Sequence, residues 1–127
     1  MTDTGNQLSS TRTAVVTDAD TAARFGPSFP QAASTPFVLG LAEVACHDAV
    51  RPLLADGRIT VGTSAHVEHL APTPVGDTLT ARATLREQVG SRLEFDVEVR
   101  DSRDVVARIR HTRAVVDPQR IEGRLAR

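Results

Sequence analysis

The chain has 127 residues, of which 40% are hydrophobic and only 3% aromatic, and 15 basic residues nearly balance 16 acidic ones. The net charge of −1 excludes a general nucleic-acid binder, and no apolar run approaches the ~18 residues that cross a membrane. The polar N-terminus and the lone Cys46 give no sign of a secretory leader, an internal disulfide or a cysteine zinc site. We therefore expect one cytoplasmic domain with an aliphatic core.

The first elements that the sequence predicts are short. Residues 1–12 are polar and aperiodic, which predicts a flexible N-terminal tail. Residues 13–16 form a candidate strand, and Asp18 can cap a brief helical turn that runs to Arg24. Two prolines and a glycine in residues 25–34 then predict a loop.

The segment that begins at Thr35 is the strongest helix prediction. Thr35 can cap this helix, and Pro36 fits the first helical position because its missing N–H costs nothing there. Pro52 bends or ends the helix. Spacings of three to four residues place its apolar face on Phe37, Leu41, Val44, Ala45, Ala49 and Leu53.

From Arg58 onward the apolar period changes from 3.6 to 2, which predicts four consecutive strands. Turns or short connections separate the strands, and a charged C-terminal tail follows over residues 118–127. The four expected inward faces are Ile59, Val61, Thr63, Ala65, Val67 and His69; Leu79, Ala81, Ala83 and Leu85; Leu93, Phe95, Val97 and Val99; and Val105, Ala107, Ile109, His111, Arg113 and Val115.

One slim helix followed by four antiparallel strands is an α+β arrangement. The order predicts a hotdog fold over residues 13–117, in which a curved antiparallel β-sheet wraps around one long central helix. A ferredoxin-like sandwich would need a second long helix between strands, and the pattern predicts none there.

Two polar residues occupy positions at which the periodicity of the helix and of the first long strand predicts apolar side chains. Glu43 lies in the most apolar stretch of the helix, where a carboxylate is seldom buried without a partner. His69 has the inward phase of its strand, whereas His66 falls on the opposite face, so this pair predicts no metal site. Structural alternatives stay open, because Glu43 can face solvent or pair with an arginine, and His69 can be an ordinary core histidine.

Three further residues belong to the same regions of the sequence. Arg113 has an inward phase, so it needs a carboxylate, a phosphate or a subunit boundary as its partner. Thr35 lies eight residues before Glu43, which is about 12 Å along a helix axis, and a plain capping role stays open for it. No charge near Cys46 clearly favours a thiolate, so we do not expect a nucleophile there.

Residues 35–46 (TPFVLGLAEVAC) resemble the central helix of the fluoroacetyl-CoA thioesterase group of hotdog proteins. In that group a Thr begins the helix, a Glu follows eight residues later, and a Cys stands three residues beyond. Residues 61–76 resemble the family's next strand and turn, with the catalytic His 26 residues after the Glu, and residues 111–115 resemble its last strand. The resemblance needs no gap from about Phe29 to Val116.

The resemblance implies an acyl-CoA thioesterase that hydrolyses a small, short-chain and fluoroacetyl-like thioester to an acid and CoA. It implies that Thr35, Glu43 and His69 are catalytic. It also implies that Gly62 offers a backbone N–H near the thioester oxygen and that Arg113 supports the site. The expected assembly is a homodimer with its sites between the subunits, and the only expected cofactor group is the coenzyme A of the substrate.

Phe25 and Phe29 lie in the loop just before Thr35. We interpret them as a hydrophobic lid over a small acyl group, and docking of the loop on the core is the alternative. A different function also stays open, namely a hotdog module that binds an acyl-CoA or acyl-carrier thioester without hydrolysing it. Release of free thiol from acyl-CoA esters distinguishes the two functions.

Overall fold

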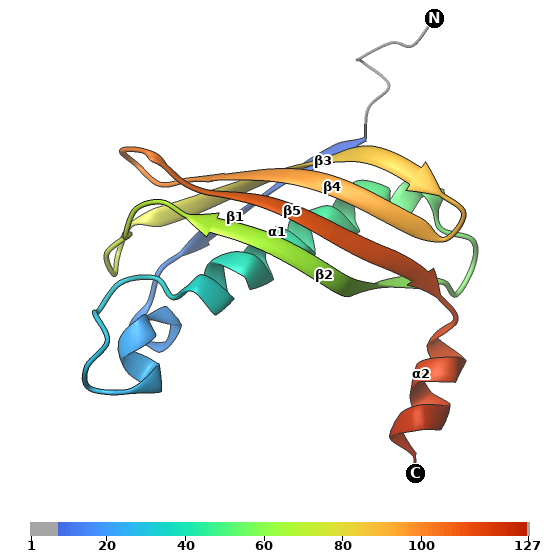
Figure 1. The fold of residues 1–127 in the computed structure, drawn as a ribbon, viewed down its shortest axis with the longest axis horizontal. Coiled ribbons are helices and arrows are strands. Elements are labelled where there is room, and N and C mark those ends of the chain that lie inside the picture. Colours follow the sequence, from blue (N-terminus) through green and yellow to red (C-terminus); the bar gives the residue numbers. More distant parts are fainter. Residues whose placement is uncertain (1–7, 127) are drawn as a thin grey trace, which may run out of the picture.

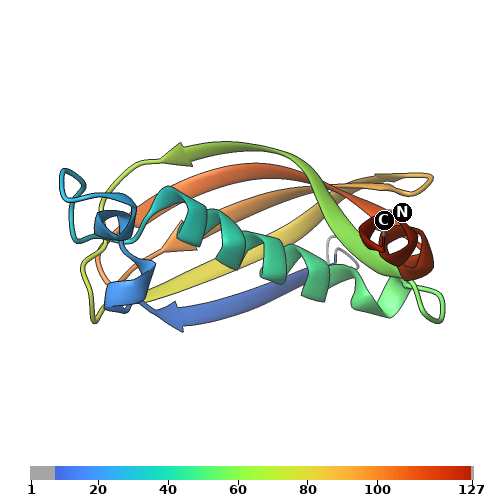
Figure 2. The same ribbon diagram turned by 90° about the horizontal axis from the view of Figure 1, so that it is seen from below.

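The computed structural model describes residues 8–126 of the chain. Its strands form one antiparallel sheet in the order β1-β3-β4-β5-β2, and helix α1 lies across the concave face of this sheet (Figures 1 and 2). This is the predicted architecture of a curved sheet around one helix. The elements are β1 (Ser9–Val15), η2 (Asp18–Asp20), η3 (Ala22–Phe25), α1 (Thr35–Val50), η4 (Arg51–Leu53), β2 (Ile59–His69), β3 (Thr78–Val89), β4 (Arg92–Arg100), β5 (Val105–Val116) and α2 (Pro118–Leu125), where η marks a short 3-10 helix.

Helix α1 is capped by a different residue from the one predicted. Ser34 is the N-cap, because its hydroxyl accepts a hydrogen bond of 3.1 Å from the N–H of Phe37. Pro36 lies in the first turn, where its missing N–H costs nothing. Both Ser34 and Thr35 are good capping types, so the sequence could not choose between them. The Thr35 hydroxyl is therefore available for another partner.

The buried face of α1 is rotated from the predicted one. Val44 and Leu53 are 39% and 49% exposed, so their assignment to the core was wrong. Nearly every residue from 37 to 46 is apolar, and spacing alone therefore fits more than one face. The residues of α1 that are buried are Val38, Leu41, Ala42, Ala45, Cys46, Ala49 and Val50.

The alternation predicted for β3, β4 and β5 is confirmed over most of each strand. Residues with the predicted inward phase pack against α1, and their neighbours point to the outer face of the sheet. One face of an antiparallel sheet is buried here, which is the arrangement that gives a clean period of two. The buried inward residues are Leu79, Ala81, Ala83, Leu93, Phe95, Val97, Val99, Ala107, Ile109, His111 and Arg113.

Strand β2 contains a bulge that the predicted alternation missed. Its pairing with β5 shifts register between Gly62 and Ser64, so Thr63 is an extra residue. Directly paired residues share a face of the sheet, and the partners of the inward β5 residues are Thr60 and Gly62 before the bulge and Ala65, Val67 and His69 after it. Ile59 and Val61, predicted to face inward, therefore lie on the outer side.

Both predicted tails contain regular structure among the described residues. Strand β1 begins at Ser9, so residues 9–12 pair with β3 instead of belonging to a tail, whereas residues 1–7 lie outside the described residues. After β5, the side chain of Asp117 accepts a hydrogen bond of 2.9 Å from the N–H of Gln119 and so caps α2. Pro118 fits the first turn of α2, where its missing N–H costs nothing.

Two short 3-10 helices replace the single helical turn predicted from Asp18 to Arg24. The capping residue is Thr17 and not Asp18, because the Asp20 carboxylate accepts hydrogen bonds of 2.9 Å from the N–H of Thr17 and 2.8 Å from its hydroxyl. The predicted loop then leads into α1. Among residues 8–126, no helix is long and apolar enough to span a membrane.

Candidate active site

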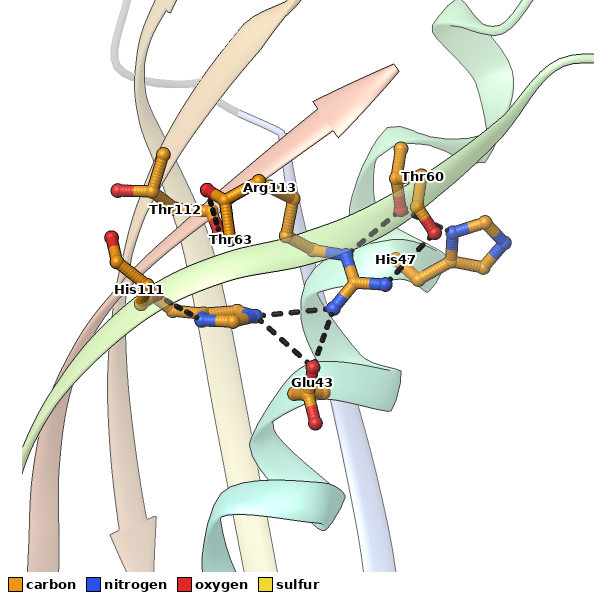
Figure 3. A network of polar contacts seen from close by, with 8 residues as sticks. Glu43, His47, Thr60, Thr63, His111, Thr112 and Arg113 are labelled. Carbon is orange, nitrogen blue, oxygen red and sulfur yellow. Dashed lines mark hydrogen bonds and ion pairs between the residues drawn. The ribbon is translucent and has the colours of Figure 1, made fainter. Parts of the chain in front are cut away.

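Glu43 and Arg113 form an ion pair between α1 and β5. Arg113 Nη1 donates a hydrogen bond of 3.1 Å to Glu43 Oε2 (Figure 3). Arg113 is only 7% exposed, so the carboxylate offsets the cost of burying its charge. The Glu43 side chain is 40% exposed, which leaves part of its carboxylate open to a ligand.

The remaining nitrogens of Arg113 are also held. Its Nε donates a hydrogen bond of 2.8 Å to the Thr60 hydroxyl, and its Nη2 donates one of 2.9 Å to the Thr60 carbonyl. Nη1 lies 3.1 Å from His111 Nε2. This fixed guanidinium gives the Glu43 carboxylate a defined place beside the sheet.

His111 is the second buried residue that contacts this ion pair. Its Nδ1 lies 2.8 Å from the Ser64 carbonyl, which can only accept, so Nδ1 carries the proton. Nε2 is then the acceptor for Arg113. Burial lowers the pKa of His111, and the charge of Arg113 lowers it further, while the Ser64 hydrogen bond and Glu43 oppose the shift. His111 is therefore a neutral ring at neutral pH.

Gly62 lies opposite Arg113 on β2, immediately before the bulge. A Cβ atom at this position would come within 2.5 Å of Glu43 Oε2 and 3.0 Å of His111 Cε1. Any side chain at position 62 would therefore displace the carboxylate. Glycine is required here so that Glu43 can approach the backbone of β2.

Thr35 and His69 form a separate polar pair at the beginning of α1. Thr35 Oγ1 lies 2.8 Å from His69 Nδ1, while Nε2 is buried and forms no hydrogen bond with any residue in 8–126. Burial lowers the pKa of His69, and the nearby backbone of Ala71 opposes part of this shift. The pair borders a hollow of about 340 Å³ that Pro30, Leu70 and other loop residues also line.

The two groups of residues lie apart along α1 and β2. Eight residues of helix separate Thr35 from Glu43, or about 12 Å along the axis. Gly62 similarly precedes His69 by seven residues of strand. Within one chain, the structure brings Thr35 to His69 and brings Glu43 to Gly62 and Arg113. Among the described residues, no hydrogen bond or ion pair joins one group to the other.

The two predicted lid residues are exposed. Phe25 ends η3 and is 66% exposed, and Phe29 lies in the following loop and is 53% exposed. Neither residue lines the hollow beside Thr35 and His69. The two rings are therefore not docked on the core, which was the alternative to a lid.

Three residues of the polar network were absent from the predicted site. They are His111, Thr60 and His47, whose Nδ1 lies 2.6 Å from Thr60 Oγ1. The available signal for His47 was its spacing, because it follows Glu43 by four residues and so shares its helix face. Thr60 could not be found in the same way, since the bulge changes the phase of β2. Cys46, in contrast, is fully buried, and burial raises the pKa of its thiol to about 12, as expected for an inert cysteine.

Comparisons with known proteins give a consistent result. Residues 16–119 match the family of fluoroacetyl-CoA-specific thioesterases. The chain is 37% identical over 97 residues to the fluoroacetyl-CoA thioesterase of Streptantibioticus cattleyicolor, an alignment that covers 76% of this chain and 70% of that protein. A variant of the fluoroacetyl-CoA thioesterase solved with acetyl-CoA superposes with a TM-score of 0.88 at 32% identity, covering 94% of this chain and 95% of the other. A thioesterase superfamily member from Thermus thermophilus shares the fold, with a TM-score of 0.86 at 21% identity over 99% of this chain and 93% of the other.

Proposed function

The chain belongs to the fluoroacetyl-CoA thioesterase family, and on this premise we propose that it hydrolyses a small acyl-CoA thioester to the free acid and CoA. The observation that carries this proposal is the 2.8 Å contact between the Thr35 hydroxyl and Nδ1 of His69. A hydroxyl beside a neutral imidazole can exchange a proton with it, which is the chemistry that acyl transfer requires. The relative solved with acetyl-CoA supports a short acyl chain.

The complete site in this proposal contains residues from two copies of the chain. Strand β2 is an edge strand, and an unpaired edge is a template for pairing with another chain. If two β2 strands pair in antiparallel fashion about a twofold axis near their middle, the first half of one strand meets the last half of the other. Glu43 and Gly62 of one protomer would then lie beside the partner subunit's Thr35 and the partner subunit's His69.

Each side chain has a defined task in the proposed hydrolysis. The Gly62 N–H donates to the carbonyl oxygen as negative charge develops there, and one such donor is typically worth ~10²- to 10³-fold in rate. A new C–O bond forms as the C–S bond breaks. If water attacks directly, Glu43, oriented by Arg113, positions and activates it, and His69 accepts the proton of the water and returns it to the thiolate of CoA. If the Glu43 carboxylate attacks instead, the C–S bond breaks to give an anhydride and the thiolate. Water that loses its proton to His69 then hydrolyses the anhydride to the free acid and the Glu43 carboxylate, and His69 passes this proton to the thiolate.

Phe25 and Phe29 belong to this proposal as contacts for the acyl group. Their exposure, 66% and 53%, supports rings that are free to pack against a substrate. Apolar rings over a small acyl group would exclude water from the reacting carbonyl and limit chain length. Arginine guanidinium groups can bind the CoA phosphates, and most of the 15 arginines have solvent-exposed side chains.

A thiol-release screen over acyl-CoA esters of two to sixteen carbons tests the proposed activity. We expect saturable hydrolysis with the highest kcat/KM for the shortest chains, fluoroacetyl-CoA included, and a fall in kcat/KM as the chain lengthens. The chain has no Trp or Tyr, so binding of CoA is visible at 260 nm above a very low protein absorbance. Tight binding without thiol release from any ester would instead identify a non-hydrolytic acyl-CoA module.

The substitution Gly62→Ala tests the position of Glu43. We expect the variant to fold, because the atom nearest the new methyl group is the end of a flexible side chain. The carboxylate must shift, however, and displacement of a catalytic group by about 1 Å can cost ~10²-fold in rate. The predicted result is a fall of about 10²-fold in kcat with a melting temperature close to that of the wild type.

Gly123→Ala in α2 is the matched control for that substitution. A Cβ at Gly123 meets no atom within 4 Å, so the same chemical change is made in open space. This control should hydrolyse acyl-CoA at the wild-type rate. An unchanged kcat in Gly62→Ala would show that the close approach of Glu43 to β2 has no role in turnover.

A further inference from the structure

We propose that His47 is a positioning residue, which acts through the Thr60 hydroxyl to fix Arg113 and thereby the Glu43 carboxylate. This inference rests on the proposed function, because it assigns a role to a side chain that does not touch the substrate. Its basis is a continuous chain of short contacts. His47 Nδ1 lies 2.6 Å from Thr60 Oγ1, Thr60 Oγ1 lies 2.8 Å from Arg113 Nε, and Arg113 Nη1 lies 3.1 Å from Glu43 Oε2 (Figure 3).

The directions of these hydrogen bonds follow from the donor and acceptor groups. Arg113 can only donate, so the Thr60 hydroxyl accepts from its Nε. The hydroxyl then has one proton of its own to donate, and Thr60 is 5% exposed, which leaves it little access to water. His47 Nδ1 accepts this proton when the ring is neutral and carries its own proton on Nε2. Every group in the chain then has the partner it needs.

Protonation of His47 breaks this arrangement. Nδ1 becomes a donor, so the buried Thr60 hydroxyl loses its acceptor, and an unsatisfied buried donor is costly. A second positive charge would also stand near Arg113. Neutral His47 therefore stabilises the position of Arg113, and protonated His47 weakens it.

The charges around His47 favour the neutral ring. Its pKa is lowered mainly by burial and then by Arg113 on β5, with a smaller contribution of the same sign from Arg51 in η4. Asp48, the next residue of α1, opposes the shift, but its carboxylate is already engaged by Arg12 of β1 at 2.8 Å and by Arg51 at 3.7 Å. At neutral pH the ring is thus available to accept from Thr60.

Two substitutions of His47 separate the acceptor from the titrating ring. In His47→Asn, Oδ1 takes the place of Nδ1 as an acceptor but does not titrate, whereas His47→Leu has no acceptor. We expect His47→Leu to lower kcat by about tenfold, the scale of one hydrogen bond to a charged network, with KM changed less than twofold. His47→Asn should keep kcat within about twofold of the wild type at pH 8.

The pH dependence of kcat distinguishes a positioning role of His47 from a merely structural one, because a structural role would not change this dependence. Titration of His69 and His111 is common to both proteins and cancels in the ratio of kcat for His47→Asn to kcat for the wild type. Because the pKa of His47 is lowered from its usual 6.5, this ratio should be constant above that pH and rise below it. A constant ratio across the range, or a His47→Asn variant as slow as His47→Leu, would overturn the proposal.

A measurement without substrate keeps this inference separate from the proposed function. The Nε–H signal of Arg113 in a ¹⁵N NMR spectrum should exchange slowly with water in the wild type and in His47→Asn, and faster in His47→Leu. If the wild type hydrolyses no acyl-CoA ester but this pattern holds, the proposed function fails and the positioning role of His47 stands. Equal exchange rates in the three proteins would refute the role of His47 whatever the activity.

Discussion

Glu43→Gln is expected to lower kcat for acyl-CoA hydrolysis by about 10³-fold, within the range typical of a lost general base or acid. Glutamine keeps the shape of the side chain and one carbonyl oxygen, so it can still accept from Arg113 Nη1 at the position where the carboxylate oxygen now lies 3.1 Å away. The substitution therefore removes the negative charge and the basic oxygen, while the buried guanidinium keeps its bonds to Thr60 and His111. The effect should be confined to the chemical step.

Steady-state release of CoA thiol, thermal melting and CoA binding at 260 nm together check this prediction. The affinity for CoA should stay near its wild-type value. The melting temperature should fall, because Arg113 is buried and loses the charge that offsets its burial, so kcat is compared at a temperature well below both melting transitions. Glu87→Gln on β3 is the matched control, since Glu87 is an exposed carboxylate and β4 separates its strand from β5, which carries Arg113. Turnover near the wild-type rate in Glu43→Gln would remove this carboxylate from the mechanism.

The parts of the fold that the sequence could predict are those in which local pattern and burial agree. Strands β3 and β4 have one buried face and one solvated face, so Leu79 to Leu85 and Leu93 to Val99 alternate as written in the sequence. The inward phase of Arg113 was readable for the same reason. Its partner was predictable only as a class, an anion or a boundary, because a one-dimensional pattern does not say which carboxylate lies across the sheet.

The features that escaped prediction arise where two local solutions have similar free energies. Ser34 and Thr35 are both competent caps, and only tertiary contact with His69 decides which hydroxyl faces the helix N–H groups. The bulge at Thr63 leaves each half of β2 in regular alternation, so no single residue reveals it. Thr60 precedes the bulge and has the opposite phase to the one predicted, so its contacts with His47 and Arg113 were beyond the reach of periodicity.

The candidate site divides in the same way. The residues alone identified Glu43 and His69 as polar groups in apolar surroundings. They did not distinguish a catalytic role from a solvent-facing or arginine-paired Glu43, or from an ordinary core histidine at position 69. The roles of Thr35 and Gly62 came from family resemblance. The physical reason for glycine at position 62 is a contact of the absent Cβ with Glu43 across two elements, and only the three-dimensional structure contains that distance.

His69→Ala is expected to lower kcat by about 10³-fold and to change the shape of the pH profile. The pKa of His69 is lowered from its usual 6.5, mainly by burial, so the ring is the neutral, proton-accepting form at pH 7 and above. Wild-type kcat should thus be constant down to about that value and fall as the pH drops through the lowered pKa and the ring becomes protonated. The residual kcat of His69→Ala should not show the fall at low pH that protonation of His69 causes in the wild type. His66→Ala, whose side chain points to the outer face opposite Arg110, should keep the wild-type profile.

Mixing the two slow variants tests how the subunits share the site. In a heterodimer of Glu43→Gln and His69→Ala, a site built from two protomers receives an intact Glu43 from one subunit and an intact His69 from the other. The second site of that heterodimer carries both defects. Random exchange of subunits should therefore restore roughly a quarter of the wild-type activity, since half of the dimers have one intact site out of two. If each site instead lies within a single protomer, every site keeps one defect and mixing restores nothing, so the recovery decides between the two arrangements.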